Sequence, residues 1–347
     1  MTVFVGVNRV ATGWVEYGET PELGQRSGTD DGLLPLDPSL LKIRLAGLAP
    51  GKRYYYRVHA CEIDFRNAYD IRRGAEVRSE VREFVTFDPT AATARLSIIN
   101  DTHEVPATLQ GLAKLLAARP SDALIWNGDL FNDIRSERQL AQQVLTPGGG
   151  ALASDRPLLP VRGNHDVRGA SARLLDKYFD LPQGRWYYTQ RIGPLALLVL
   201  DTGEDKPDSA PVYAGLNDFA HYRSQQQQWL QTALQREEFR SAKYRVAAMH
   251  IPLIWKEKAS AGDYCGDGHS KWHDLLVAAK VDVVISGHTH EPGWFAPGQR
   301  APYGQLVGGG PKPEAATLIE VHADLSKLTL ATLGLDGRER SRYELPS

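Results

Sequence analysis

The hydrophobic pattern divides the chain into two parts that predict different folds. Up to about residue 88, apolar and aromatic residues come in short runs, separated by connections rich in Gly, Pro and Asp. The clearest runs are 12–17, 40–45, 54–59 and 81–87. Short strands joined by such turn residues are typical of a small β-sandwich. We therefore expect residues 1–88 to form an all-β domain.

After residues 88–93, which we interpret as a linker, strand-like and helix-like patterns alternate. Apolar runs predict strands near 95–99, 122–126, 157–161, 195–200, 244–249 and 281–286. Helical spacing of apolar residues predicts helices over 105–118, 136–145 and 171–180, and one that starts near residue 224. The tail from about 303 to 343 is strand-like again. This alternation predicts an α/β domain over residues 89–347.

Polar and ionisable side chains follow five of these apolar runs, at the point where each run ends. They are Asn100-Asp101-Thr102-His103, Asn127-Gly128-Asp129, Gly163-Asn164-His165-Asp166, His250 and Gly287-His288-Thr289-His290. Sites in α/β sheets lie beyond the carboxyl ends of the strands, so we expect the five groups to meet at one edge. Each group has a plainer interpretation, such as a helix cap, a core histidine or a turn. Five such coincidences in one chain favour a metal site.

The last group is the most suggestive one taken alone. Gly287 allows the backbone to turn where the apolar run stops. Alternate residues of an extended segment share a face, so His288 and His290 are expected to point to the same side. Two imidazoles aimed at one place suggest a metal, although paired histidines in loops are more often exposed to solvent.

Composition limits the class of protein. The 347 residues are 42% hydrophobic and 24% charged, which is ordinary for a globular chain. A formal net charge of -2 gives no general attraction to nucleic acid or acidic membranes, without excluding nucleic acid as a substrate. No run of 18 apolar residues predicts a membrane span. Cys61 and Cys265 lie far apart and outside any CxxC pattern, so no disulfide framework or cysteine zinc site is indicated.

The five groups together resemble the motif set of the calcineurin-like metallophosphoesterase superfamily, over about residues 95–310. Residues 43–58 resemble a hairpin of fibronectin type III-like domains, and the domain order resembles that of purple acid phosphatase-like proteins. The resemblance implies a four-layer αββα sandwich, in which two mixed sheets pack face to face with helices outside. Relatives with this domain order are often exported, so we expect a periplasmic or secreted protein if a leader has been removed, and otherwise a cytoplasmic one.

The resemblance also implies two metal sites that share one carboxylate. The first would be formed by Asp101, His103, Asp129 and His290, and the second by Asp129, Asn164, His250 and His288. This mixture of oxygen and imidazole ligands suits two ions of manganese, iron or zinc better than calcium. The implied activity is hydrolysis of a small phosphoester, most directly a phosphomonoester, by a hydroxide that bridges the metals. Alternatives are a phosphodiesterase acting on nucleotide or phospholipid-derived diesters, and a non-catalytic ligand-binding or scaffold protein.

Other positions receive roles from the same resemblance. His165 is expected to face the substrate and to stabilise the transition state or protonate the leaving oxygen. Asp166 is expected to orient a histidine, or else to cap a helix. Asn132 occupies the position of the tyrosine ligand of purple enzymes, which argues against a true purple enzyme. GNHD in place of GNHE likewise argues against the serine/threonine phosphatase subfamily that carries GDxVDRG.

Two segments are expected to select the substrate and one to act as a connection. Residues 205–222 and 255–273 are candidate substrate loops, because loops at the site edge usually determine specificity. The run 308–310 consists of three glycines and is expected to be a flexible connection.

Overall fold

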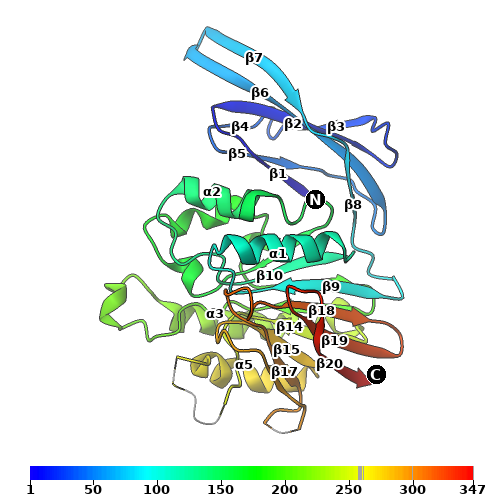
Figure 1. Ribbon diagram of the computed structural model, residues 1–347, viewed down its shortest axis with the longest axis vertical. Coiled ribbons are helices and arrows are strands. Elements are labelled where there is room, and N and C mark those ends of the chain that lie inside the picture. The colour runs from blue at the N-terminus through cyan, green and yellow to red at the C-terminus, as the bar shows by residue number, and fades with distance from the viewer. Residues whose placement is uncertain (257–259, 261, 299, 347) are drawn as a thin grey trace.

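The computed structural model describes residues 1–256, 260, 262–298 and 300–346 (Figure 1). Within residues 1–88 the regular elements are all strands, in agreement with the all-β prediction. They are β1 (Thr2–Gly6), β2 (Ala11–Gly18), β3 (Gln25–Ser27), β4 (Leu36–Asp37), β5 (Leu40–Arg44), β6 (Arg53–Asn67), β7 (Asp70–Arg78) and β8 (Arg82–Val85). β1 and β5 form a two-stranded sheet, and the other strands form a six-stranded sheet in which β6 pairs with β2, β7 and β8.

The core of this first part lies between its two sheets. Val15 from β2, Leu41 and Ile43 from β5, and Tyr54 from β6 are buried against one another. Tyr56 is buried as well, so these two tyrosines are core residues, as their alternation along the strand predicts. The sandwich packs on the rest of the molecule through apolar and polar contacts, among them a hydrogen bond of 2.6 Å from Tyr56 Oη to the carbonyl of Ser154.

The second part contains two six-stranded mixed sheets. The first has the order β11-β10-β9-β18-β19-β20, from β11 (Leu158–Val161), β10 (Ala123–Asn127), β9 (Ala94–Ile99), β18 (Leu318–Ala323), β19 (Lys327–Leu333) and β20 (Glu339–Pro346). The second has the order β12-β13-β14-β15-β17-β16, from β12 (Tyr188–Ile192), β13 (Leu195–Val199), β14 (Tyr244–Ala248), β15 (Val283–Ser286), β17 (Gly304–Val307) and β16 (Gly293–Phe295).

Helices cover the outer face of each sheet, so the layers follow the order helix, sheet, sheet, helix (Figure 1). Alternate residues of one strand serve the two interfaces. Ile125 packs between the sheets, whereas Leu124 and Trp126 pack under α1 (Pro106–Ala117) and α2 (Glu137–Leu145). On the other side, α3 (Phe219–Ala233), α4 (Glu237–Arg240) and α5 (Gly266–Ala278) cover the second sheet. The mixed α/β architecture is therefore confirmed.

Two predicted helices differ in type or start. Residues 171–180 form a 3-10 helix, η3 (Ala172–Tyr178), because its buried residues Ala172, Leu175 and Tyr178 recur every three positions. α3 begins at Phe219 rather than near residue 224, since the carboxylate of Asp208 accepts the N–H groups of Phe219 and Ala220 at 2.9 and 2.8 Å. The remaining 3-10 turns are η1 (Pro147–Gly149), η2 (His165–Val167), η4 (Pro182–Gly184) and η5 (Pro211–Tyr213).

The prediction that residues 255–273 form a substrate loop was partly wrong, because the last eight of these residues belong to α5. Cys265 caps this helix by accepting the N–H of Gly268 at 3.3 Å, and Trp272 and Leu276 are buried one turn apart. Residues 257–259 and 261 of the same segment lie outside the described residues. Among the helices that the structure describes, none combines the length and the apolar character needed to cross a membrane.

Candidate metal centre

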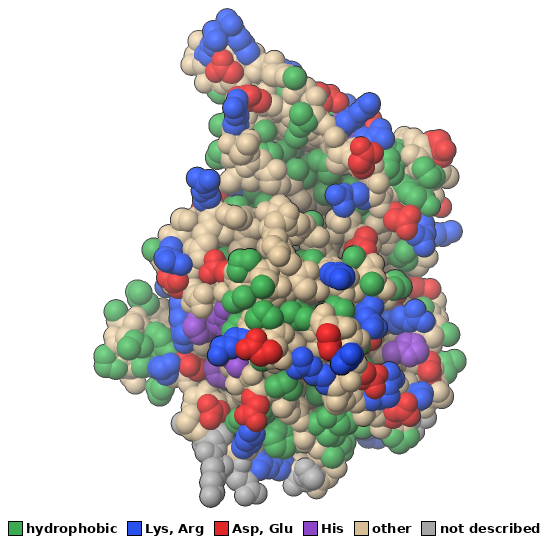
Figure 2. All heavy atoms as spheres, viewed as in Figure 1, with side chains coloured by type: hydrophobic (Ala, Val, Ile, Leu, Met, Phe, Trp, Pro, Cys, Tyr) green, Lys and Arg blue, Asp and Glu red, His purple; other side chains and the backbone are tan. Residues whose placement is uncertain are grey.

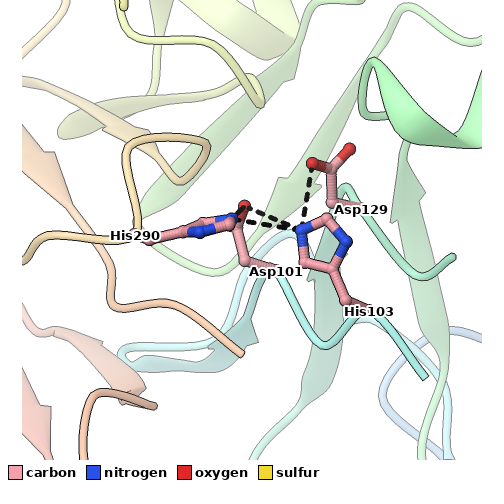
Figure 3. Close-up of side chains that lie close together, drawn as sticks. All are labelled: Asp101, His103, Asp129 and His290. Carbon is pink, nitrogen blue, oxygen red and sulfur yellow. Dashed lines mark hydrogen bonds and ion pairs between the residues drawn. The ribbon is translucent and has the colours of Figure 1, made fainter. Parts of the chain in front are cut away.

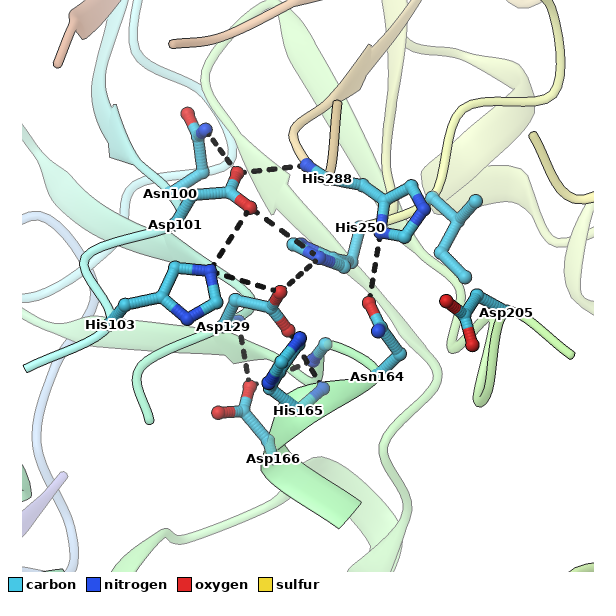
Figure 4. A network of polar contacts seen from close by, with 12 residues as sticks. Asn100, Asp101, His103, Asp129, Asn164, His165, Asp166, Asp205, His250 and His288 are labelled. Atoms are coloured by element: carbon cyan, nitrogen blue, oxygen red, sulfur yellow. Dashed lines mark hydrogen bonds and ion pairs between the residues drawn. The ribbon is translucent and has the colours of Figure 1, made fainter. Parts of the chain in front are cut away.

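The five polar groups meet at one edge of the double sheet. β9, β10 and β11 are mutually parallel in the first sheet, and β13, β14 and β15 are parallel in the second. Their carboxyl ends therefore open toward the same place, as predicted. Figure 4 shows side chains from the segments after β9, β10, β11, β14 and β15 converging there.

One group surrounds the carboxylates of Asp101 and Asp129. His290 Nε2 lies 3.2 Å from Asp101 Oδ1, and His103 Nε2 lies 3.4 Å from Asp129 Oδ2 and 3.1 Å from His290 Nε2 (Figure 3). One possible ligand atom from each of these four residues lies within 4.8 Å of the others. The two carboxylates are buried, whereas 45% of the His290 side chain is exposed. Figure 2 shows that histidine side chains reach the surface of the face drawn there.

A second group shares Asp129 with the first. His250 Nε2 lies 3.2 Å from Asp129 Oδ2, and ligand atoms of Asp129, His250 and His288 lie within 4.8 Å of one another. His288 Nδ1 lies 2.9 Å from the amide oxygen of Asn164 (Figure 4). The structure therefore brings together both predicted sets of residues around a common carboxylate.

The donor atoms of the second group have the arrangement that a cation requires. His288 Nε2 lies 2.8 Å from the carbonyl oxygen of Gly262, so Nε2 carries the proton and the Nδ1 lone pair faces Asn164 Oδ1. His250 Nδ1 lies 2.9 Å from the carbonyl of Asn127, which directs Nε2 at the carboxylates. Within the described part of the chain, the buried atoms Asp101 Oδ1 and His250 Nε2 have no hydrogen-bond partner. Lone pairs that face one another in a buried site fit metal ions.

The carboxylates give this edge a strong preference for positive charge. Burial lowers the pKa of His250, but Asp129 and Asp101 outweigh it and raise the pKa to about 10. Burial likewise lowers the pKa of His103, and the same carboxylates raise it overall. Conversely, burial raises the pKa of Asp101, and the facing histidines bring it well below its usual range. The site thus holds cationic charge, which two metal ions would supply in place of protons.

Backbone strain is concentrated at the same edge. Six residues other than glycine have positive φ here: Asp101 (49°), His103 (42°), Glu104 (61°), Asp129 (52°), His288 (72°) and His290 (57°). Such conformations are uncommon and cluster at functional sites. The expectation that His288 and His290 leave an extended segment on one face was wrong. Their left-handed conformations send one ring toward Asn164 and the other toward Asp101.

Glycines allow the closest approaches beneath the ligands. A Cβ atom on Gly287 would lie 2.2 Å from Asp101 Oδ2, which accepts the N–H of His288 at 2.8 Å. A Cβ on Gly308 would lie 2.0 Å from Asn100 Oδ1. The run 308–310, expected to be flexible, is therefore buried and closely packed against the site.

His165 lies beside the first group, with its ring centroid 4.8 Å from that of His103. Its backbone N–H donates to Asp129 Oδ1 at 2.9 Å, and its Nδ1 lies 2.7 Å from the carbonyl of Asn132. Burial lowers the pKa of His165. The side chain of Asn132 donates to the carbonyl of His103 at 3.2 Å.

Asp166 lies behind the ligands and binds backbone rather than the side chain of a histidine. Its carboxylate accepts N–H groups from Asp129 (2.9 Å), Leu130 (2.9 Å), Phe131 (3.3 Å) and Gly163 (2.8 Å). The expectation that Asp166 orients a histidine is therefore corrected. Asp166 orients the backbone amides of two loops that carry candidate ligands. Burial and the charge of Asp129 raise its pKa to about 7, while the amides act in the opposite direction.

Sequence reasoning placed Asn100 in the first polar group but gave it no role in supporting the centre. The side chain of Asn100 donates to Asp101 Oδ2 and to the carbonyl of Gly309, both at 2.6 Å. Its place directly before Asp101 was a signal that could have been used. Of the two candidate substrate loops, 205–222 brings Asp205 to the side of the centre where Asn164 and His288 lie (Figure 4).

Comparison with known proteins identifies the family. Residues 94–292, more than half of the chain, match the family model described as calcineurin-like phosphoesterase. The chain therefore belongs to this family.

Curated relatives match shorter stretches. The serine/threonine-protein phosphatase CPPED1 of Homo sapiens is 27% identical over 170 residues, which are 47% of this chain and 51% of that protein. The Pongo abelii protein of the same name is 29% identical over 140 residues, 39% of this chain and 41% of its own. The matched region thus spans about half the length of these relatives or less.

Solved structures resemble nearly the whole chain. The purple acid phosphatase PPD1 from yellow lupin (Lupinus luteus) has a TM-score of 0.70 and 15% identity, covering 99% of this chain and 72% of that one. PhoD has a TM-score of 0.65 and 13% identity, covering 98% and 83%. At these identities the likeness shows a shared fold.

Proposed function

We propose that this protein is a phosphoester hydrolase that depends on two metal ions and acts preferentially on phosphomonoesters. The observation that carries the proposal is the pair of ligand groups that share Asp129. A carboxylate with two oxygens can serve two cations, and two-metal sites are typical of enzymes that cleave phosphoesters.

The donor set indicates how the ions would be held. Asp101, His103, Asp129 and His290 would hold one ion, and Asp129, Asn164, His250 and His288 the other. These oxygen and imidazole donors suit manganese, iron or zinc. When bound, such a pair supplies Lewis acidity, which activates water for attack and offsets negative charge on the phosphoryl oxygens.

The remaining residues orient the ligands and meet the substrate. The carbonyls of Asn127 and Gly262 accept hydrogen bonds from the imidazole N–H groups of His250 and His288, which fixes the nitrogen that each ring presents to the centre. Asp166 holds the loops that carry Asp129 and Asn164. We propose that His165, at the rim of the first group, contributes to stabilising charge on the phosphoryl or leaving oxygen.

The domain organisation is part of the proposal. We propose that residues 89–347 form the catalytic domain and that residues 1–88 form a separate sandwich of the fibronectin type III-like kind. Support comes from the strand pairing, because none of the described strands of one part pairs with a strand of the other.

A direct test compares two esters. Purified protein loaded with manganese is assayed with an aryl phosphomonoester, and separately with the corresponding diester. Because the matched relatives are named serine/threonine-protein phosphatases, a phosphoserine peptide is a third substrate. Preference for the monoesters supports the proposal, whereas preference for the diester favours the phosphodiesterase alternative. No turnover of any of the three with two metals bound per chain refutes the enzyme and leaves a ligand-binding protein.

A further inference from the structure

An arginine that no metal-ligand motif contains joins His165 to the start of the candidate substrate loop 205–222. Arg168 Nη1 lies 3.0 Å from His165 Nε2. Its other donors bind Glu204, with Nε to Oε1 at 2.9 Å and Nη2 to Oε2 at 2.7 Å, and Nη2 also reaches Asp205 Oδ1 at 3.1 Å. The guanidinium thus bridges the rim of the metal centre and two carboxylates from one loop.

The partners of His165 determine which nitrogen carries its proton. The carbonyl of Asn132 can only accept, so Nδ1 is the N–H that donates across 2.7 Å. A guanidinium can only donate, so Nε2 accepts a hydrogen bond from Arg168. Both ring nitrogens are therefore assigned by their neighbours, and the ring has little freedom to rotate or to exchange tautomers.

The carboxylates that hold Arg168 are themselves fixed. Only 1% of the Glu204 side chain and 16% of that of Asp205 are exposed. Tyr213 Oη lies 2.9 Å from Glu204 Oε2 and 3.0 Å from Asp205 Oδ1, so its single proton is shared between the two carboxylates. The backbone of Glu204 is held as well, because Arg223 donates to its carbonyl at 2.7 Å.

The charges of Arg168, Glu204, Asp205 and Lys206 are balanced. Attraction of an anionic substrate therefore does not explain why these side chains are grouped. Arg168 is matched by Glu204, and Asp205 pairs with Lys206 at 2.9 Å as well as with Arg168. The Arg168 side chain is 26% exposed, and its Nε, Nη1 and Nη2 atoms all have partners. A guanidinium held in this way gives geometric precision rather than a free positive charge.

We propose that Arg168 is a positioning residue, which holds the His165 ring in one tautomer and one orientation at the rim of the metal centre. Glu204, Asp205 and Tyr213 fix Arg168 in turn. Because His165 Nε2 accepts from Arg168 and Nδ1–H donates to Asn132, His165 has no N–H free for a substrate oxygen in this arrangement. Its contribution to stabilising charge there is therefore made together with Arg168, and the two side chains act as one unit. The inference rests on the proposed function only for its effect on turnover, since the tautomer of His165 can be observed without any substrate.

The first experiment measures the coupling of the two residues. In the manganese-loaded enzyme, Arg168→Met should lower kcat by about 10²-fold with little change in KM, because a misplaced group costs about that much. In a His165→Ala background the same substitution should lower kcat by less than about threefold, since coupled residues are not additive. Arg168→Lys should recover part of the loss. If Arg168→Met lowers kcat by the same factor with and without His165, the proposal is wrong. It is also wrong if Arg168→Met keeps the wild-type kcat.

Two controls separate positioning from general damage. Arg135→Met removes an ion pair with Asp133 in which 70% of the arginine side chain is exposed, and it should leave kcat and KM unchanged. All variants should retain two metals per chain. If Arg168→Met does not fold, Glu204→Gln replaces it, and it should lower kcat only where His165 is present. An equal loss in the His165→Ala background would contradict the inference.

The second experiment is independent of turnover. Long-range 1H–15N spectra of the zinc-loaded full chain, with His165 assigned from the His165→Ala variant, should show the Nδ1–H tautomer. In Arg168→Met the signal should shift toward a mixture of tautomers. An Nε2–H tautomer in the wild type, or an unchanged spectrum in the variant, would refute the inference. Absence of turnover in the wild type with the expected spectra would refute only the proposed function.

Discussion

Asp166→Asn tests whether one buried carboxylate holds the loops of the metal centre together. The substitution keeps the shape of the side chain and replaces one oxygen by an NH2 group. Each carboxylate oxygen of Asp166 now accepts two backbone N–H groups, at 2.8 and 2.9 Å on one side and 2.9 and 3.3 Å on the other. In either orientation of the amide, two buried N–H groups would face a donor.

The expected loss in the free energy of unfolding follows from the two N–H groups that lose their acceptor. An unsatisfied buried donor costs about 1–3 kcal/mol, so we expect a loss of about 2–6 kcal/mol in the free energy of unfolding. For a domain of roughly this size each kcal/mol lowers Tm by about 2–4 °C, which gives a decrease of at least about 4 °C. Because the affected loops carry Asp129 and Asn164, metal affinity should fall together with Tm.

The assay is thermal unfolding at pH 8, with and without EDTA, together with metal analysis. This pH is above the pKa of Asp166, which burial and Asp129 raise to about 7, so the wild-type carboxylate is charged. Asp133→Asn is the control, because 42% of that side chain is exposed in an ion pair on the same loop. A change in Tm below about 1 °C for Asp166→Asn would refute the reasoning, since it would mean that the amides are satisfied in another way.

Three further predictions concern the ligands and their neighbours. His290→Ala should reduce the metal content from two ions per chain toward one and lower activity in parallel, and two retained ions would show that His290 is not a ligand. His165→Ala should keep both metals while kcat falls by about 10²–10⁴-fold, the usual range for such a group; a metal-free variant would instead make it a ligand. Gly287→Ala places a Cβ 2.2 Å from Asp101 Oδ2 and should abolish metal binding, so normal metal content with normal Tm would contradict the close approach.

Local sequence determined the elements and the motifs of the catalytic part. Strands and helices with clear apolar spacing, such as β9, β10, α1 and α2, begin and end within about two residues of their predicted bounds. The polar groups were visible because each directly follows a buried strand, and parallel strands necessarily present those ends at a common edge.

Elements that depend on distant partners could not be predicted in this way. The start of α3 depends on Asp208, eleven residues before it, and the start of α5 depends on a cysteine that acts as a cap. The three glycines at 308–310 are indistinguishable from a flexible connection in sequence, and only the packing of Asn100, Ala315 and His290 against them excludes larger residues.

The candidate centre shows the same division. The sequence by itself determined which residues gather at this edge, because that follows from motif order and strand direction. The sharing of Asp129 by two groups was implied by the resemblance to the family. Only the tertiary structure decided the left-handed conformations of His288 and His290, the nitrogen that each imidazole presents, and the contact between Arg168 and Glu204, 36 residues apart in the chain. Hydrogen-bond partners that determine a tautomer or hold a guanidinium come from separate loops, and local spacing contains no information about which loops will meet.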